Sequence, residues 1–177
     1  MIHQNVGNSY RQGIELQGVW KPIDWFRWDA NATFSRNRAK DWTVKSDNKK
    51  PLNFGTTHLS FSPDVIFNNI FTFDYHGFAA ALQSQYIGEQ YMTNDNNRNL
   101  MLDDYFVSNL DLSYSFKLKS IKQVSVGATI YNLFSKKYFS NGHASATYDD
   151  NGRETSNETV YSPQAPINFL AHLSLTF

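Results

Sequence analysis

Very few side chains in this 177-residue sequence have the types and the spacing that catalysis or metal binding requires. His172 is a candidate for acid–base chemistry, but no serine or cysteine in the setting of a nucleophile accompanies it. Acidic pairs at 103–104 and 149–150 lack the alternating ligand spacing of a calcium-binding loop. The five histidines include no pair at i and i+4. The sequence therefore predicts no catalytic, metal-binding or cofactor-binding residues, and we interpret His172 as a solvated polar side chain.

The composition excludes further classes of protein. The 16 basic and 16 acidic side chains cancel, so there is no electrostatic basis for a nucleic-acid partner. The absence of cysteine excludes thiol catalysis, cysteine-bound zinc and a disulfide scaffold. A mean hydropathy of −0.51 and the lack of an apolar run of about 18 residues predict no membrane-spanning helix. Aromatic residues make up 16% of the chain, an enrichment typical of the interface girdles of membrane β-barrels.

Residues 167–177 have the period of a half-buried strand. Leu170 is the one lapse in an otherwise regular alternation of apolar and polar side chains. A strand of about 9–11 residues with one apolar face fits an outer-membrane barrel, although a soluble all-β domain has the same period. The apolar side chains of this stretch are Ile167, Phe169, Ala171, Leu173, Leu175 and Phe177.

The same two-residue period recurs along the chain. It is clearest at 25–38, where a slip of one residue would exchange the apolar and polar faces, so the register is strongly specified. Pro63 interrupts the pattern and indicates an edge, a bulge or a restart. We predict an all-β fold of about seven antiparallel up-and-down strands. Their ranges are 9–20, 25–38, 65–75, 78–91, 105–118, 124–130 and 167–177.

The connections between these strands alternate between short and long. The short ones are 21–24, 76–77 and 119–122, and the long ones are the loops 39–53, 92–103 and 140–165. Outer-membrane barrels have short periplasmic turns and long extracellular loops, whereas a soluble sandwich has no reason to segregate its loops by length. The pattern therefore predicts part of a transmembrane β-barrel in the bacterial outer membrane, in contact with lipids and lipopolysaccharide. Aromatic side chains are expected at the membrane interfaces, namely Trp20, Trp25, Trp28, Tyr105 and Tyr138.

Short motifs follow one another in a specific order over nearly the whole chain. They are Gly13-Ile14-Glu15-Leu16 with Trp20-Lys21-Pro22, Ser62-Pro63-Asp64, Tyr86-Ile87-Gly88-Glu89-Gln90-Tyr91 with Asn94, Leu102-Asp103-Asp104-Tyr105-Phe106, Tyr131-Asn132-Leu133-Phe134-Ser135-Lys136-Lys137-Tyr138 with Ser140-Asn141-Gly142, and Ser162-Pro163-Gln164-Ala165. A single motif such as Asn-Leu-Phe is weak, but their order and spacing together are specific. In this respect the chain resembles the C-terminal barrel region of TonB-dependent outer-membrane receptors.

The resemblance implies a barrel of about 22 strands with an N-terminal plug, which imports a scarce nutrient with energy passed on by TonB. About seven strands are fewer than the roughly eight of the smallest closed barrels, and open sheet edges in lipid leave backbone groups unpaired. We therefore expect residues 1–177 to be the C-terminal portion of such a barrel, with the plug and the earlier strands outside them. Met1–Asn5 has no signal-peptide character, which agrees with this expectation.

Two roles remain open at the level of the sequence. The chain could supply the barrel wall and extracellular loops of a transport receptor whose nutrient is not readable from it, or it could form a small oligomeric porin-like or structural barrel. A hydrolase lacks any nucleophile–base pair. Aromatics of the outer loops could contact a ligand, although packing is the favoured interpretation: Tyr91, Tyr148 and Tyr161. The last strand resembles the C-terminal signal read by the barrel assembly machinery, through Phe169, Ala171, Leu173, Leu175 and Phe177.

Overall fold

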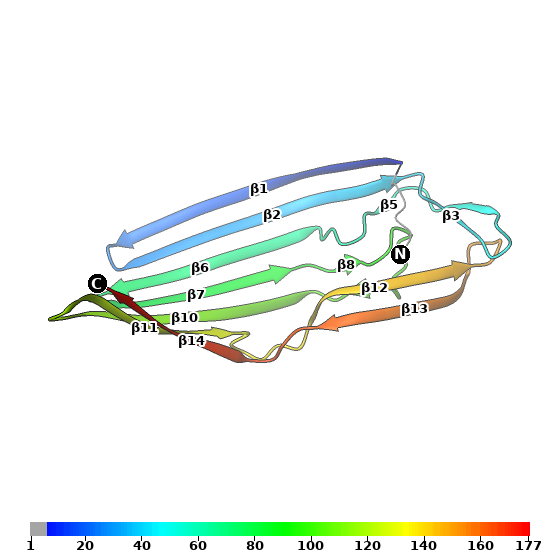
Figure 1. Cartoon of the computed structure of the whole chain (residues 1–177). Helices are drawn as coiled ribbons and strands as arrows, with labels where there is room; N and C mark the ends of the chain where they lie inside the picture. The colour runs from blue at the N-terminus through cyan, green and yellow to red at the C-terminus, as the bar shows by residue number, and fades with distance from the viewer. Residues whose placement is uncertain (1–6) are drawn as a thin grey trace.

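The computed structural model describes residues 7–177 as strands joined by turns and loops, and Met1–Asn5 lie outside the described residues. Seven strands form one antiparallel meander in chain order (Figure 1): β1 (Asn8–Ile23), β2 (Phe26–Lys40), β6 (Val65–Tyr75), β7 (Phe78–Ile87), β10 (Tyr105–Leu118), β11 (Ile121–Tyr131) and β14 (Asn168–Thr176). A short strand β5 (Thr57–His58) pairs with the outer end of β2. No helix that could cross a membrane is found in residues 7–177. The predicted all-β, up-and-down arrangement is confirmed.

The register of the sheet keeps apolar side chains in line across neighbouring strands. Trp20 of β1 lies opposite Trp28 of β2, and Trp28 lies opposite Phe71 of β6. At the other edge, Val126 of β11 lies opposite Leu173 of β14. Because side chains alternate between the two faces, these pairs share one face of the sheet and the polar residues share the other. Leu173 is 63% exposed and Trp20 57%, so this large apolar face is suited to contact with lipid rather than water.

The turn between β6 and β7 explains how two adjacent strands reverse with only two residues. His76 and Gly77 both have positive φ, of 48° and 82°, as a two-residue hairpin turn of the right twist requires. A Cβ at Gly77 would lie 2.3 Å from the carbonyl oxygen of Ser115 in β10. Glycine is therefore required here both for its backbone conformation and for the close approach of the neighbouring strand.

The long connections are more ordered than the sequence predicted. They contain three hairpins: β3 (Thr43–Lys45) with β4 (Pro51–Asn53), β8 (Gln90–Tyr91) with β9 (Met101–Leu102), and β12 (Phe139–Tyr148) with β13 (Glu154–Pro163). Interpreting 140–165 purely as a loop was therefore wrong. The predicted strand 78–91 also needs correction, since β7 ends at Ile87 and β8 belongs to a separate sheet.

The three hairpins pack together at the end of the sheet opposite the short turns, and we call them the outer cluster (Figure 1). Its apolar centre consists of Met92, Leu100, Leu102 and Ala144, each at most 8% exposed. Strand β12 lies close to this centre at Gly142, where a Cβ would be only 2.8 Å from the Met92 sulfur. Side chains from the connection between β7 and β10 and from the connection between β11 and β14 thus fill one small core.

Polar contacts between the hairpins add to this core. The buried Tyr148 hydroxyl donates to the Asp95 carboxylate at 2.6 Å, and burial followed by this contact raises the pKa of Tyr148. The Asp150 carboxylate accepts from the Ser46 hydroxyl at 2.5 Å and from the Asn48 amide at 3.2 Å. These two hydrogen bonds lower the pKa of Asp150. Their contribution is present above the usual carboxyl pKa of 3.8 and is lost as the pH falls through the lowered value.

Replacing Tyr148 with Phe tests how far the outer cluster depends on its buried polar contact. We expect the change to leave Asp95 without its donor and to lower the local opening free energy of the cluster by about 1–3 kcal/mol. Amide hydrogen exchange of residues 90–102 and 139–148 measures this loss. The control is Tyr161→Phe, at a more exposed tyrosine on β13, which should leave exchange unchanged. Equal exchange in both variants would contradict the role given to Tyr148.

Candidate functional site

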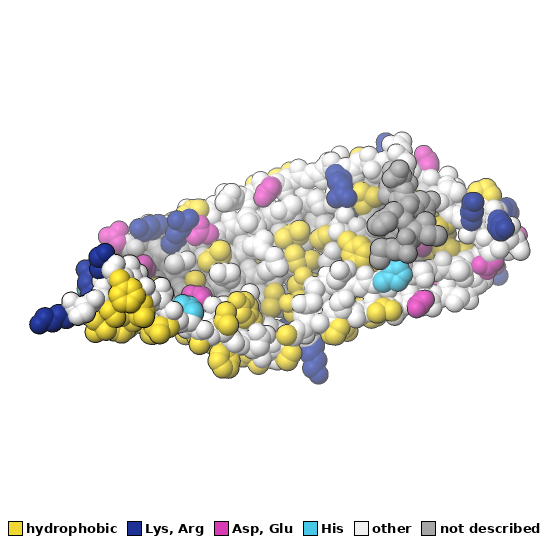
Figure 2. All heavy atoms as spheres, in the orientation of Figure 1, with side chains coloured by type: hydrophobic (Ala, Val, Ile, Leu, Met, Phe, Trp, Pro, Cys, Tyr) yellow, Lys and Arg dark blue, Asp and Glu magenta, His cyan; other side chains and the backbone are white. Residues whose placement is uncertain are grey.

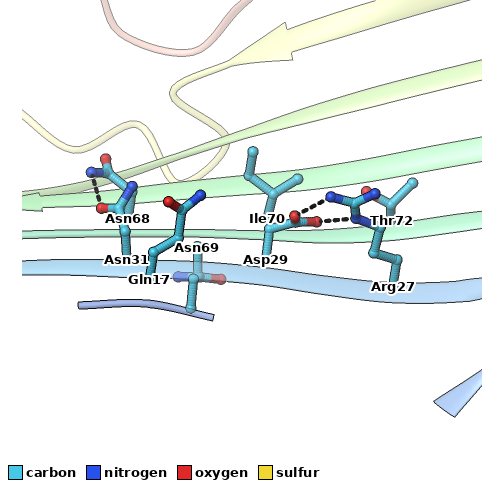
Figure 3. Close-up of a pocket in the computed structure, with 9 residues that line it drawn as sticks. Gln17, Arg27, Asp29, Asn31, Asn68, Asn69, Ile70 and Thr72 are labelled. Carbon is cyan, nitrogen blue, oxygen red and sulfur yellow. Dashed lines mark hydrogen bonds and ion pairs between the residues drawn. The ribbon is translucent and has the colours of Figure 1, made fainter. Parts of the chain in front are cut away.

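Amide side chains from neighbouring strands form a hydrogen-bonded row on the polar face of the sheet. The Asn68 side-chain nitrogen donates to the Asn31 side-chain oxygen at 2.9 Å, and the Gln85 side-chain nitrogen donates to the Asn68 oxygen at 2.8 Å. The register also places Gln17 of β1 opposite Asn31, so amide side chains lie in line on four strands. Figure 3 shows Gln17 and the hydrogen bond between Asn68 and Asn31. Each side-chain amide can donate and accept at the same time. The amides can therefore hold one another in position and still offer hydrogen-bonding groups to a neighbour on the polar face.

A cavity of about 480 Å³ lies along this row, and we call it the inner cavity. Arg27 and Asp29 form a two-pronged ion pair at its edge, with N···O distances of 2.7 and 2.5 Å (Figure 3). Because the pair neutralises itself, the wall offers hydrogen bonds without net charge. Asn68, Ile70 and Thr72 of β6 complete the lining with Gln17 and Asn31. Such a surface is suited to a polar protein segment or to water.

A second cavity of about 930 Å³ lies against the outer cluster, and we call it the outer cavity. The strand β12, the segment around β8 and the loop before β6 all contribute to its wall. Aromatic rings, amides and hydroxyls alternate around it. The lining includes Trp42, Phe61, Gln90, Asn94, Asn141 and His143.

Phe61 lies in the outer cavity in an unusual backbone conformation. Its φ is 50°, a left-handed value that a bulky aromatic residue rarely adopts. The Phe61 N–H donates to the Tyr91 carbonyl at 2.8 Å, and the Ser60 N–H donates to the Asn94 side-chain oxygen at 2.6 Å. These contacts hold the strained residue in place, while its side chain remains 42% exposed. Strain of this kind is concentrated at functional sites, which marks Phe61 as a candidate contact residue.

An ion pair anchors the loop that carries Phe61. Arg38 of β2 donates to both oxygens of Asp64, at 3.0 and 2.9 Å, and His58 lies 3.8 Å from the same carboxylate. The hydrogen bond from Arg38 holds the pKa of Asp64 below its usual value. Ser35 also donates to the Pro63 carbonyl at 3.0 Å. The motif at 62–64, which sequence reasoning noted without assigning a role, thus fixes the loop to the barrel wall.

The sequence-predicted candidates for chemistry are not brought together. His172 lies on the polar face opposite Gly127, where a Cβ would come within 2.5 Å of its ring. Asp149 accepts hydrogen bonds from the N–H groups of Asn151 and Arg153, as a turn residue does. No group of three His, Cys, Asp or Glu side chains that could hold a metal occurs in residues 7–177.

The predicted interface aromatics fall into two separate groups. Trp28 stacks on Phe71 with ring centroids 5.9 Å apart, and Trp25 stacks on Phe73 at 6.2 Å, near the end of the sheet with the short turns. Tyr105 instead stacks with Tyr138 at 4.4 Å and is only 9% exposed. Tyr105 alternates with Phe106 and so belongs to the polar face of β10. A place at the membrane interface stays a prediction for all five.

The outer-loop tyrosines mostly pack against their neighbours. Tyr148 is buried, and Tyr91 lies against His58 with ring centroids 4.7 Å apart. Tyr161 lies against Phe139 at 4.8 Å. Gln90, Asn94 and Asn141 of the outer cavity belong to motifs noted in the sequence, whereas its aromatic residues Trp42 and Phe61 were not singled out. They come from loops that carry no periodic signal.

The last strand carries the predicted assembly signal along one face. Phe169, Ala171, Leu173 and Leu175 alternate with polar residues and pair in register with β11. Lys122 of β11 donates to the Phe177 carbonyl at 2.7 Å. The other edge of β14 has no partner strand among residues 7–177, and the same is true of the outer edge of β1.

Known proteins share this architecture at low sequence identity. The siderophore receptor PiuA from Acinetobacter baumannii matches 93% of this chain with a TM-score of 0.70 at 14% identity. The ferric citrate transporter FecA matches 92% with a TM-score of 0.67 at 14% identity. The ferric yersiniabactin uptake receptor FyuA from Yersinia pestis matches 92% with a TM-score of 0.64 at 15% identity. Comparison with curated proteins finds no match.

The matched part is small in each of these structures. The chain spans 21% of PiuA, 23% of FecA and 22% of FyuA. A family model described as "TonB dependent receptor-like, beta-barrel" matches residues 1–133, three-quarters of the chain. The remaining residues continue the same sheet through β14. The chain belongs to the TonB-dependent receptor-like β-barrel family of the outer membrane, and its sheet has the barrel fold of these receptors.

Proposed function

We propose that residues 1–177 form the C-terminal barrel wall and the extracellular loops of a TonB-dependent receptor that imports a nutrient. The observation that carries the proposal is a two-faced sheet of this family's fold with both edges unpaired in residues 7–177. An unpaired backbone group in lipid costs several kcal/mol, so other strands must complete the barrel. The family match favours strands of the same receptor over an oligomeric porin-like assembly.

The two faces of the sheet support a different partner for each face. The apolar face meets membrane lipids and, toward the outer cluster, lipopolysaccharide. The polar face meets the plug, and the amides of Gln17, Asn31 and Asn68 provide hydrogen bonds for it along the inner cavity. TonB acts through the plug, and the barrel assembly machinery reads the last strand. The names of PiuA, FecA and FyuA support uptake of a nutrient as the purpose of this arrangement.

The first prediction concerns the orientation of the chain. Cysteine introduced at Asn151, in the β12–β13 turn, should react with a membrane-impermeant maleimide on intact cells of the source bacterium. Cysteine introduced at Ser120, in the β10–β11 turn, should react only after permeabilisation, because short turns face the periplasm. The unsubstituted protein is the control, since residues 1–177 contain no cysteine. Labelling of Ser120→Cys on intact cells would overturn the proposed orientation.

The second prediction concerns assembly. Replacing Phe177 with Ser in the native gene should lower the amount of the protein in the outer membrane, because the change removes the terminal aromatic of the proposed signal. Quantitative immunoblotting of outer-membrane fractions measures the effect. The matched control is Leu170→Ser, which removes an exposed apolar side chain from the polar face of the same strand. An unchanged level of Phe177→Ser, or an equal loss in both variants, argues against a signal centred on Phe177.

A further inference from the structure

We propose that the outer cavity binds a neutral polyhydroxylated ligand, an oligosaccharide, with Trp42 and Phe61 as its stacking surface. The inference rests on the proposed function and names the class of nutrient that such a receptor would take. It is carried by the chemistry of the lining side chains, by their support from the outer cluster and by the lack of lysine and arginine among the described residues of the lining.

The described lining of the cavity has no permanently charged cation, and the imidazole of His143 is its one basic side chain. No lysine, arginine or glutamate is among the described residues that line it. Its one carboxylate, Asp95, already accepts from the Tyr148 hydroxyl at 2.6 Å, the Thr93 hydroxyl at 2.5 Å and the Asn97 N–H at 3.2 Å. Figure 2 shows a hollow along one face of the molecule, with mainly uncharged side chains in its middle and charged side chains mostly toward its ends.

The remaining side chains match the two kinds of surface on a sugar ring. Aromatic rings pack against the apolar C–H face of a pyranose, and Phe61 is exposed for such a contact. Three side-chain amides line the cavity, Gln90, Asn94 and Asn141, and their N–H groups can donate to sugar hydroxyls. The oxygens of Asn94 and Asn141 already accept from the backbone N–H groups of Ser60 and Gly142. Its volume of about 930 Å³ accommodates several sugar units.

A negatively charged metal chelate is a poorer match. Carboxylate or catecholate oxygens are recognised by arginine or lysine, which form the strongest charge-assisted hydrogen bonds. The arginine of the inner cavity, Arg27, is already paired with Asp29, and Arg38 is paired with Asp64 near the outer cavity. Binding of a neutral ligand is expected to be insensitive to ionic strength, whereas binding of an anion weakens as salt rises.

Isothermal titration of the purified full-length receptor tests the proposal with maltohexaose, cellohexaose, laminarihexaose and, as the anionic probe, ferric citrate. We expect one hexasaccharide to bind with the same Kd at about 50 mM and about 500 mM NaCl. Trp42→Ala and Phe61→Ala should each raise that Kd about tenfold, as loss of a stacking ring does. The control is Phe134→Ala, which removes an exposed aromatic side chain outside the cavity.

Trp42→Ala is included because Phe61→Ala changes a residue whose backbone is strained and could alter the local structure. The backbone hydrogen bonds of Trp42 with Phe54 and Gly55 do not depend on the Trp42 side chain. Failure of all three hexasaccharides to bind, or binding that neither Trp42→Ala nor Phe61→Ala weakens, overturns the proposal. Salt-sensitive binding of ferric citrate that Trp42→Ala weakens overturns it as well. Maleimide labelling of Asn151→Cys, introduced into the same variants, reports the orientation of the chain and not ligand binding. Normal labelling without binding of an oligosaccharide would therefore contradict the ligand proposal and leave the receptor assignment intact.

Discussion

Backbone pairing across a sheet of an outer-membrane barrel is the constraint on which the rest of this structure depends. In the hydrocarbon there is no water to satisfy an unpaired N–H or C=O, so every strand needs a neighbour. The register that provides these bonds also decides which side chains share the apolar face of the sheet. The apolar face carries the pairs Trp28–Phe71 and Val126–Leu173. Because side chains alternate along each strand, the hydrogen-bonded amides of Asn31 and Asn68 lie on the opposite face.

The outer cluster adds a second layer of order beyond the sheet. The loops that leave β7 and β11 share a core centred on Leu100 and Leu102 and a hydrogen bond from Tyr148 to Asp95. The loop that leaves β2 joins them through the hydrogen bond from Ser46 to Asp150. Because these contacts join residues about 50 to 100 positions apart, the loops hold one arrangement rather than three independent ones. That arrangement holds together the segments that line the outer cavity, including the loop with the strained backbone of Phe61.

The seven-strand sheet could be predicted from the sequence because a two-residue period is a local signal. The alternation with neighbouring residues in the sequence is enough to predict that Leu173 and His172 lie on opposite faces of the sheet. The hairpin β12–β13 escaped prediction, since polar residues such as Ser145 and Asn157 occupy it without a regular apolar partner. Contacts such as Arg38 with Asp64, and the positive φ of Phe61, depend on tertiary structure and leave no local pattern. For this reason the outer cavity could not be predicted from the sequence.

The most direct test of this account is whether the two faces of β14 meet different solvents. Nitroxide labels at Ala171, His172, Leu173 and Ser174 of the full-length receptor in bilayers would report collision rates with oxygen and with a water-soluble nickel complex. The account predicts that labels at Ala171 and Leu173 collide mainly with oxygen, and that labels at His172 and Ser174 are shielded from lipid. Equal access of the nickel complex to all four positions would contradict a lipid-facing apolar surface.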